Sequence, residues 1–439
     1  MTGTGRSDER LVAAVLAQVE RDHLLEAVCG LVDRPSPTGG ERPVAEWIVG
    51  HLAAAGVDGT LQVIDQAQAN AVGVLAGPDD AESVLLYAPL DTYTTGDPAL
   101  DVPFAGPQMR EDMLPRATVY GDLVVGLGAG NPKGHAACVL VAVEAMARAG
   151  VDLPVDVVAA FGAGGMPSFA VDGVGVAGRT NTGHGVGASF LLGQGFTTDH
   201  AVVAKPGWTV SHEEVGLVWV DVEVPGEHTY VGSRHRMPYR NAARAAARVI
   251  EVLETWCEEY AARHEVGTMR PQGVVSSVHG GFERLAASTS ALVRVRLDLR
   301  MTPEQTASSV VREVRTALAP VAAELGAPLV VRQVASVPAT RTDPTAPVVR
   351  SAVAAWESVA GRPHELVTAN SGATDANMIR MRGVPTARVG MPKIAEGPHE
   401  ERVDFTLGMN AVDLREAKRL VEVLVRTVAG IGGHGVGQR

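Results

Sequence analysis

Short apolar runs that alternate with helical segments constrain the fold of this chain more than any other feature of its sequence. The runs are short enough to be buried strands, and the segments between several of them carry apolar side chains at helical spacing. The predicted strands lie at 60–64, 71–76, 83–88, 154–161 and 200–204. The predicted helices lie at 8–30, 44–56, 134–149 and 411–429. This alternation is typical of an α/β structure with a mixed, mostly parallel sheet flanked by helices.

The rhythm changes between residues 211 and 338. Here the apolar and polar residues of the strand-like segments alternate, and helices are predicted over 240–257 and from a capping box at 302–305. The order strand, helix, strand, strand, helix, strand is that of a ferredoxin-like α+β domain. We therefore expect a discontinuous main domain formed by 1–210 and 339–439, with a smaller domain inserted at 211–338.

Composition excludes several classes of protein. The 439 residues are 46% hydrophobic and 20% charged, as in folded enzymes of two or more domains, and no apolar run approaches the roughly 18 residues of a membrane span. The net charge of −12 has the wrong sign for nucleic-acid binding. Three scattered cysteines and the absence of a secretory signal pattern at the start lead us to expect a cytoplasmic protein.

Ligands of an open α/β sheet bind beyond the carboxyl ends of its strands. The segments at those ends are 89–91, 131–133, 164–166, 205–206, 371–375 and 397–402. The segment 162–195 is rich in glycine but has no P-loop pattern, so a surface loop is the favoured interpretation there and phosphate binding the lesser one.

Five fragments in this order resemble a known enzyme family. They are PSPTGGERPVAEWI, LLYAPLDT, YGDLVVGLGAGNPKG, the inserted domain and SGATDANMIRMRGVPTARVG. The chain resembles the di-zinc metallopeptidases that include aminoacylases, glutamate carboxypeptidases, succinyl-diaminopimelate desuccinylases and carbamoyl-amino-acid hydrolases. The resemblance implies a catalytic-type main domain, an inserted lid or dimerisation domain, a small-molecule substrate and a homodimer formed through the inserted domain.

The resemblance also shows how the chain diverges from that family. Members hold two zinc ions with five ligands and use a further glutamate as base. The corresponding residues here are Pro89 two before the retained Asp91, Asn131, Gly165 and Met166, Lys205, and His399, which matches the last histidine ligand. Proline, glycine and a lysine ammonium cannot replace hard anionic ligands. We therefore predict a degenerate metal site, no metal ligand and no zinc cofactor.

The same positions suggest a substitute chemistry. The Lys205 ammonium is predicted to stand where zinc stood, close to Asp91 and His399, and to stabilise an oxyanion or a substrate carboxylate. The alternative is that Lys205 is a decayed position. The residues predicted to contact substrate are Ser371, Gly372, Thr374, Arg300, Asn131, Lys133 and either Tyr230 or His228, the last two from the place where relatives lend a histidine to a neighbouring site.

Three functions remain open at this stage. The favoured one is a metal-independent enzyme that acts on an amide-type C–N bond of a small substrate bearing a carboxylate. The second is a catalytically inactive homologue that binds a ligand or scaffolds a partner. The third is a hydrolase with a rebuilt single-metal site, whose ligands would come from His135, His184, His399, Glu400 and Glu401.

Overall fold

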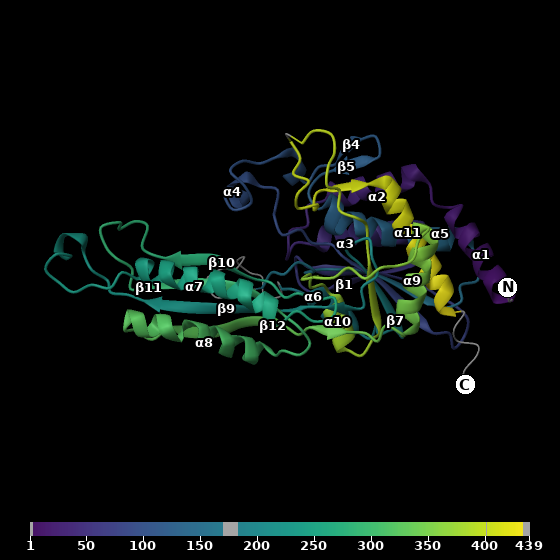
Figure 1. Ribbon diagram of the computed structural model, residues 1–439. Coiled ribbons are helices and arrows are strands. Elements are labelled where there is room, and N and C mark those ends of the chain that lie inside the picture. The colour runs from purple at the N-terminus through teal and green to yellow at the C-terminus, as the bar shows by residue number, and fades with distance from the viewer. Residues whose placement is uncertain (1–2, 170–182, 401, 433–439) are drawn as a thin grey trace. The chain divides into compact units, whose positions relative to one another are not determined.

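The chain divides into two units whose segments interleave along the sequence. The computed structural model describes residues 3–169, 183–400 and 402–432 (Figure 1). One unit takes its described residues from Met1–His212, Thr342–Leu366 and Thr374–Arg439, and the second unit from Glu213–Arg341 and Val367–Ala373. The short segment 367–373, which the sequence analysis places in the main domain, thus packs with the second unit.

A six-stranded sheet forms the centre of the first unit. Its strands are β1 (Asp58–Val63), β2 (Ala69–Leu75), β3 (Ser83–Pro89), β6 (Asp156–Gly162), β7 (His200–Ala204) and β14 (Thr386–Val389). They lie in the order β1-β2-β6-β3-β7-β14. The pairs from β6 to β14 are parallel, whereas β1, β2 and β6 pair antiparallel. The mixed, mostly parallel sheet predicted from the sequence is therefore confirmed.

Helices cover both faces of this sheet. One face carries α1 (Gly3–Leu16), α2 (Arg21–Val32), α3 (Arg42–Ala54), α5 (Gly134–Ala149), α9 (Pro347–Ala360) and α11 (Leu414–Gly432). The other face carries α6 (Val186–Gly193) and α10 (Ala376–Met381). In strand β3, Leu86 packs in the core on the face covered by α1, α2, α3, α5, α9 and α11, and Leu85 packs in the core on the face covered by α6 and α10. This burial on both faces explains why the sequence of β3 is apolar throughout.

The single helix predicted over 8–30 is two helices in the structure, so that prediction is wrong. Helix α1 ends at Leu16, and α2 begins at Arg21 after the extended residue Glu20. Val15 in α1, Val19 within the break and Leu24 in α2 are all buried in the same core. Apolar spacing therefore continues through the break and cannot reveal it.

Smaller elements complete the first unit. Strands β4 (Thr118–Tyr120), β5 (Leu123–Val125) and β15 (Ala411–Asp413) form an antiparallel sheet in the order β15-β5-β4. The short helix α4 (Pro98–Asp101) precedes it in the chain.

Among the helices of the described residues, none is both long enough and apolar enough to span a bilayer.

The second unit is an antiparallel sheet with two helices. Strands β9 (Gly216–Pro225), β10 (Gly273–Gly280), β11 (Leu292–Met301) and β12 (Val330–Val337) lie in the order β10-β11-β9-β12, and β8 (Glu213–Glu214) pairs with β13 (Thr340–Arg341). Helices α7 (Ala242–Arg263) and α8 (Ala307–Leu325) share one core with the sheet. This is the ferredoxin-like arrangement predicted from the alternating strands.

The start of α8 differs from the prediction. The capping box lies at Thr306 and Ser309, and the helix begins at Ala307. Thr302 and Gln305 do interact, because the Thr302 N–H donates to Oε1 of Gln305 at 3.0 Å. That contact closes a turn before the helix, so the residue types predicted the interaction but placed the helix four residues early.

Candidate functional site

Asp91 follows the carboxyl end of β3 and is completely buried. Its Oδ1 accepts the Gly165 N–H at 2.7 Å, and its Oδ2 accepts the Met166 N–H at 3.0 Å and the Thr38 hydroxyl at 2.7 Å. Both carboxylate oxygens are therefore bound to the loop after β6 or to the turn before α3. In this geometry Asp91 is a positioning residue that fixes the loop at 164–166.

Glu41 lies beside Asp91 and holds the preceding residue of the same loop. Its Oε1 accepts the N–H groups of Gly39 at 2.8 Å and Gly164 at 3.0 Å. Its buried Oε2 has no hydrogen-bond partner. Burial, followed by the negative charge of Asp91, raises the pKa of Glu41 to about 8. At neutral pH the Glu41 carboxyl is therefore protonated.

Close packing around these carboxylates requires glycine in the loop. Tyr87 is fully buried, and its pKa is raised by burial and then by the charge of Asp375. A Cβ atom at Gly162 would lie 1.9 Å from the Tyr87 hydroxyl oxygen, and one at Gly165 would lie 2.1 Å from Cβ of Pro89. Both distances are impossible, so this part of the glycine-rich segment is a packing requirement. Residues 170–182 of that segment lie outside the described residues.

A basic group lies at the carboxyl ends of β7 and β14. Lys205 follows β7, Arg388 lies in β14, and His135 lies in the first turn of α5; all three are at most 8% exposed. Burial, then the charge of Lys205 and that of Arg388, lowers the pKa of His135 to about 3. The imidazole is therefore neutral at physiological pH, and its Nε2 accepts the Met391 N–H at 3.1 Å.

Gly390 separates Lys205 from His135. A Cβ atom there would lie 1.7 Å from the Lys205 carbonyl oxygen and 2.7 Å from Nε2 of His135. We expect Gly390→Ala to lower the free energy of unfolding by about 2 to 3 kcal/mol, measured by urea denaturation. Gly50→Ala is the control, because Gly50 lies within α3 with open space around it, and should stabilise by roughly 0.5 to 1 kcal/mol. Equal effects of the two changes would show that Gly390 is not tightly packed.

Asn131 and Lys133, predicted to contact substrate, are held within the first unit. The Asn131 side chain donates to Sδ of Met409 at 3.4 Å, and its buried Oδ1 has no hydrogen-bond partner. The Lys133 ammonium is buried and donates to the Arg34 carbonyl at 2.7 Å. Burial lowers the pKa of Lys133 to about 7. Of the two, Asn131 is the one with polar capacity left for a ligand.

His399 lies on the surface, in contrast to Asp91 and Lys205. Its ring stacks on that of Tyr120 with the centroids 4.5 Å apart, and its backbone is left-handed at a φ of 66°. Among the described residues, the hydrogen bonds of the Asp91 carboxylate come from Thr38, Gly165 and Met166. The structure thus places Lys205 near His135, while the Asp91 carboxylate binds the loop at 164–166.

The predicted residues of the segment 371–375 fall in different units. Thr374 belongs to the first unit, where its hydroxyl accepts the Ala376 N–H at 3.2 Å at the start of α10. Ser371 and Gly372 belong to the second unit. The Ser371 hydroxyl accepts the Gln272 N–H at 3.1 Å, and the Gly372 N–H donates to Asn370 at 3.0 Å.

The remaining predicted contacts also lie in the second unit. Arg300 makes a two-pronged ion pair with Asp298 on the same strand, at 2.8 and 3.3 Å. His228 is exposed and lies 3.1 Å from the Thr289 carbonyl, while Tyr230 is 62% exposed. These contacts give Arg300 a structural partner; the substrate-binding roles of all three residues stay predictions.

Sequence reasoning missed Glu41, Tyr87, Asp375 and Arg388. Thr38 and Glu41 have the spacing of a capping box, which conceals the fact that both side chains reach into the main unit instead of capping α3. Arg388 lies in a short strand and has no motif around it. Only the tertiary structure identifies these residues.

The arrangement of histidine, cysteine and acidic side chains bears on the hypothesis of a rebuilt single-metal site. Within 3–169, 183–400 and 402–432, no group of three or more histidine, cysteine, aspartate or glutamate residues is arranged to hold a metal ion. Glu401, one of the ligands considered for that hypothesis, lies outside the described residues.

Comparison with known proteins agrees with the fold. No family model matches the chain. The structure is similar to the di-peptidase Dug1p of Saccharomyces cerevisiae, at 11% identity and a TM-score of 0.72, over 97% of this chain and 99% of that one. It is similar to human carnosine dipeptidase 1, at 14% identity and a TM-score of 0.69, over 97% of this chain and 99% of that one. It is also similar to a metallo-carboxypeptidase of the M20 family from Sulfolobus solfataricus, at 13% identity and a TM-score of 0.66, over 93% of this chain and 99% of that one. The chain therefore has the fold of M20 peptidases.

Proposed function

We propose that this protein is a metal-independent enzyme that acts on an amide-type C–N bond of a small substrate bearing a carboxylate. The observation that carries the proposal is the buried basic group of Lys205, Arg388 and His135 at the carboxyl ends of β7 and β14. Ligands of open α/β sheets bind at this edge. Positive charge held there, where water is largely excluded, favours binding of a carboxylate and of a developing oxyanion.

The residues at the family's metal-binding positions do not fit two zinc ions. Pro89, Gly165 and Met166 supply no hard side-chain ligand, Asn131 supplies only a neutral amide, and Lys205 adds positive charge. The remaining carboxylate, that of Asp91, is already bound to two backbone N–H groups and a hydroxyl. The donor set therefore supports chemistry that uses side chains alone, and we assign no step to a metal.

Lys205 and His135 are the residues to which we assign the chemistry. The Lys205 ammonium would bind the substrate carboxylate or the oxyanion formed when the amide carbonyl is attacked. His135 is neutral, and its ring lies across Gly390 from the backbone carbonyl of Lys205. His399, which is exposed and packs against Tyr120, would take part in the chemistry from the protein surface. Asp91 acts through the loop that it holds and does not serve as a base.

A Lys205→Met variant tests the proposal. With dipeptides, N-acyl and N-carbamoyl amino acids as substrates, we expect kcat/KM to fall about a hundredfold or more, as when an oxyanion-stabilising donor is lost. Lys418→Met is the matched control, since Lys418 is an exposed residue of α11, and it should leave kcat/KM unchanged. A Lys205→Met variant with full activity would contradict the assignment.

Metal analysis provides the second half of the test. Wild-type activity should survive dialysis against a strong chelator, and the purified protein should contain far less than one zinc ion per chain. About two zinc ions per chain, or activity that disappears with chelator and returns with zinc, would overturn the metal-independent mechanism.

A second candidate function is a binding protein without turnover. The commitment of both Asp91 oxygens to the loop at 164–166 favours it, because it leaves this carboxylate unable to activate water. Calorimetric binding of an N-acyl amino acid that Lys205→Met abolishes, with no turnover by the wild type, would support this second function over the first.

A further inference from the structure

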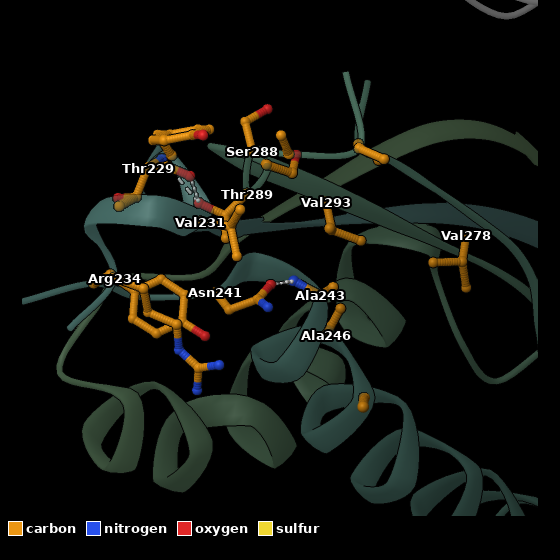
Figure 2. A pocket seen from close by; sticks show the side chains of 18 of the residues that line it. Thr229, Val231, Arg234, Asn241, Ala243, Ala246, Val278, Ser288, Thr289 and Val293 are labelled. Carbon is orange, nitrogen blue, oxygen red and sulfur yellow. Dashed lines mark hydrogen bonds between the residues drawn. The ribbon is translucent and has the colours of Figure 1, made fainter. Parts of the chain in front are cut away.

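The second unit contains a cavity of its own, which the proposed chemistry does not use. Its volume is about 510 Å³, within the range of small-molecule sites. All of its lining residues lie between Thr229 and Val293, so they belong to one unit (Figure 2). Helix α7 forms one side, and the strand residues Val278 and Val293 lie on the other.

The polar lining of this cavity includes a guanidinium and an amide that can donate hydrogen bonds. Oδ1 of Asn241 accepts the Ala243 N–H at 2.9 Å, which orients the Asn241 amide so that its Nδ2 donors remain. Arg234 stacks on the Tyr239 ring at 4.9 Å and makes no ion pair with a carboxylate among the described residues. No aspartate or glutamate is present among the described lining residues. The cavity therefore combines one positive charge with neutral donors.

The hydroxyl groups of the rim are already used by the backbone. Thr289 donates to the Glu227 carbonyl and accepts the Thr229 N–H at 2.9 Å. Ser288 and Ser290 donate to the carbonyls of Leu285 and Leu292. These bonds hold the rim in place and consume its hydroxyl protons. Apart from the hydroxyls of Thr229, Tyr230 and Tyr239, the polar side chains left for a ligand are those of Arg234 and Asn241, and Arg234 is the one that carries a charge.

The rest of the lining is apolar and leaves space. Val231, Val278, Val293 and Ile250 contribute aliphatic surface. Ala243 and Ala247 lie one helical turn apart on α7 and are exposed, so the helix presents small side chains to the cavity. An apolar chain placed over these alanines would remove both surfaces from water.

We propose that this cavity binds a small monocarboxylate that carries an aliphatic chain. The carboxylate would pair with the Arg234 guanidinium and accept from Asn241, while the chain would lie over Ala243 and Ala247. A single arginine matches a single negative charge, and the absence of an acidic lining residue disfavours a cation. Because every lining residue lies in the second unit, the proposal is independent of the chemistry assigned to Lys205.

Isothermal titration of the full-length protein with octanoate tests the site. We expect saturable binding to the wild type, and a Kd at least tenfold weaker for octanamide and for acetate, which lack the charge and the chain respectively. Arg234→Met should weaken octanoate binding at least tenfold. Arg236→Met is the matched control, because Arg236 is exposed in the same loop but does not line the cavity, and its Kd should equal that of the wild type.

A second variant tests the apolar half without touching the charge. Ala247→Phe fills the cavity from an exposed position of α7, so it should abolish octanoate binding while the circular dichroism spectrum stays that of the wild type. Lys205→Met should bind octanoate with the wild-type Kd, which separates this site from the proposed active site. Absence of saturable octanoate binding, equal binding by Arg234→Met, or loss of binding in Lys205→Met would each overturn the proposal.

Discussion

Asp91→Ala is expected to destabilise the first unit by about 3 to 5 kcal/mol. The substitution leaves two buried donors without an acceptor, the N–H groups of Gly165 and Met166. The Thr38 hydroxyl keeps a second acceptor, the Thr92 carbonyl at 3.3 Å. Each orphaned buried donor costs about 1 to 3 kcal/mol. Part of that cost is recovered, because the neighbouring Glu41 no longer feels the charge of Asp91. Urea denaturation followed by tryptophan fluorescence measures the change.

Hydrogen exchange shows whether the loss of stability occurs in the loop that Asp91 binds. In Asp91→Ala, the amides of 164–166 should exchange faster than in the wild type, while those of β9 and β11 in the second unit should not change. Asp79→Ala, at an exposed aspartate, is the control and should change stability by less than about 0.5 kcal/mol. Unchanged protection of 164–166 in Asp91→Ala would mean that Asp91 does not hold this loop.

The fold was predictable because its signals are local. Strand β3 is apolar along its length because Leu85 and Leu86 face different cores. In β9, Val220, Val222 and Val224 alternate with Asp221 and Glu223 because only one face of that sheet carries helices. Each pattern indicates how many faces of the sheet are covered. Parallel α/β sheets have both faces covered, whereas antiparallel sheets often leave one face in solvent.

The candidate site was predictable only in part, because its interactions are long-range and involve the backbone. The resemblance located Asp91 and Lys205, but it suggested that Asp91 faces a catalytic partner. Asp91 instead binds N–H groups 74 and 75 residues further along the chain. Backbone donors leave no trace in the amino-acid sequence. The same reason concealed Glu41, whose Oε1 binds the Gly164 N–H, 123 residues away.

The stability of the protein is expected to fall as the pH rises from 4.5 to about 8, and Glu41→Gln should remove most of this dependence. Glu41 titrates at about 8 in the folded protein and near 4.5 when unfolded, so the folded state holds the proton more tightly. Its contribution is fully present below pH 4.5 and is lost as the pH passes 8. At 1.36 kcal/mol per pKa unit, the gap corresponds to about 5 kcal/mol.

Glutamine reproduces the protonated carboxyl group and cannot ionise. Its Oε1 can still accept the N–H groups of Gly39 and Gly164, so Glu41→Gln and the wild type should differ by less than about 1 kcal/mol at pH 5. At pH 8.5 the variant should be more stable by several kcal/mol, measured by urea denaturation at both pH values. Glu26→Gln, at an exposed glutamate, should keep the wild-type dependence. Asp91→Asn should weaken the dependence without removing it, because burial outweighs the charge of Asp91 in raising the pKa of Glu41. Parallel pH profiles for wild type and Glu41→Gln would show that Glu41 is ionised in the folded protein.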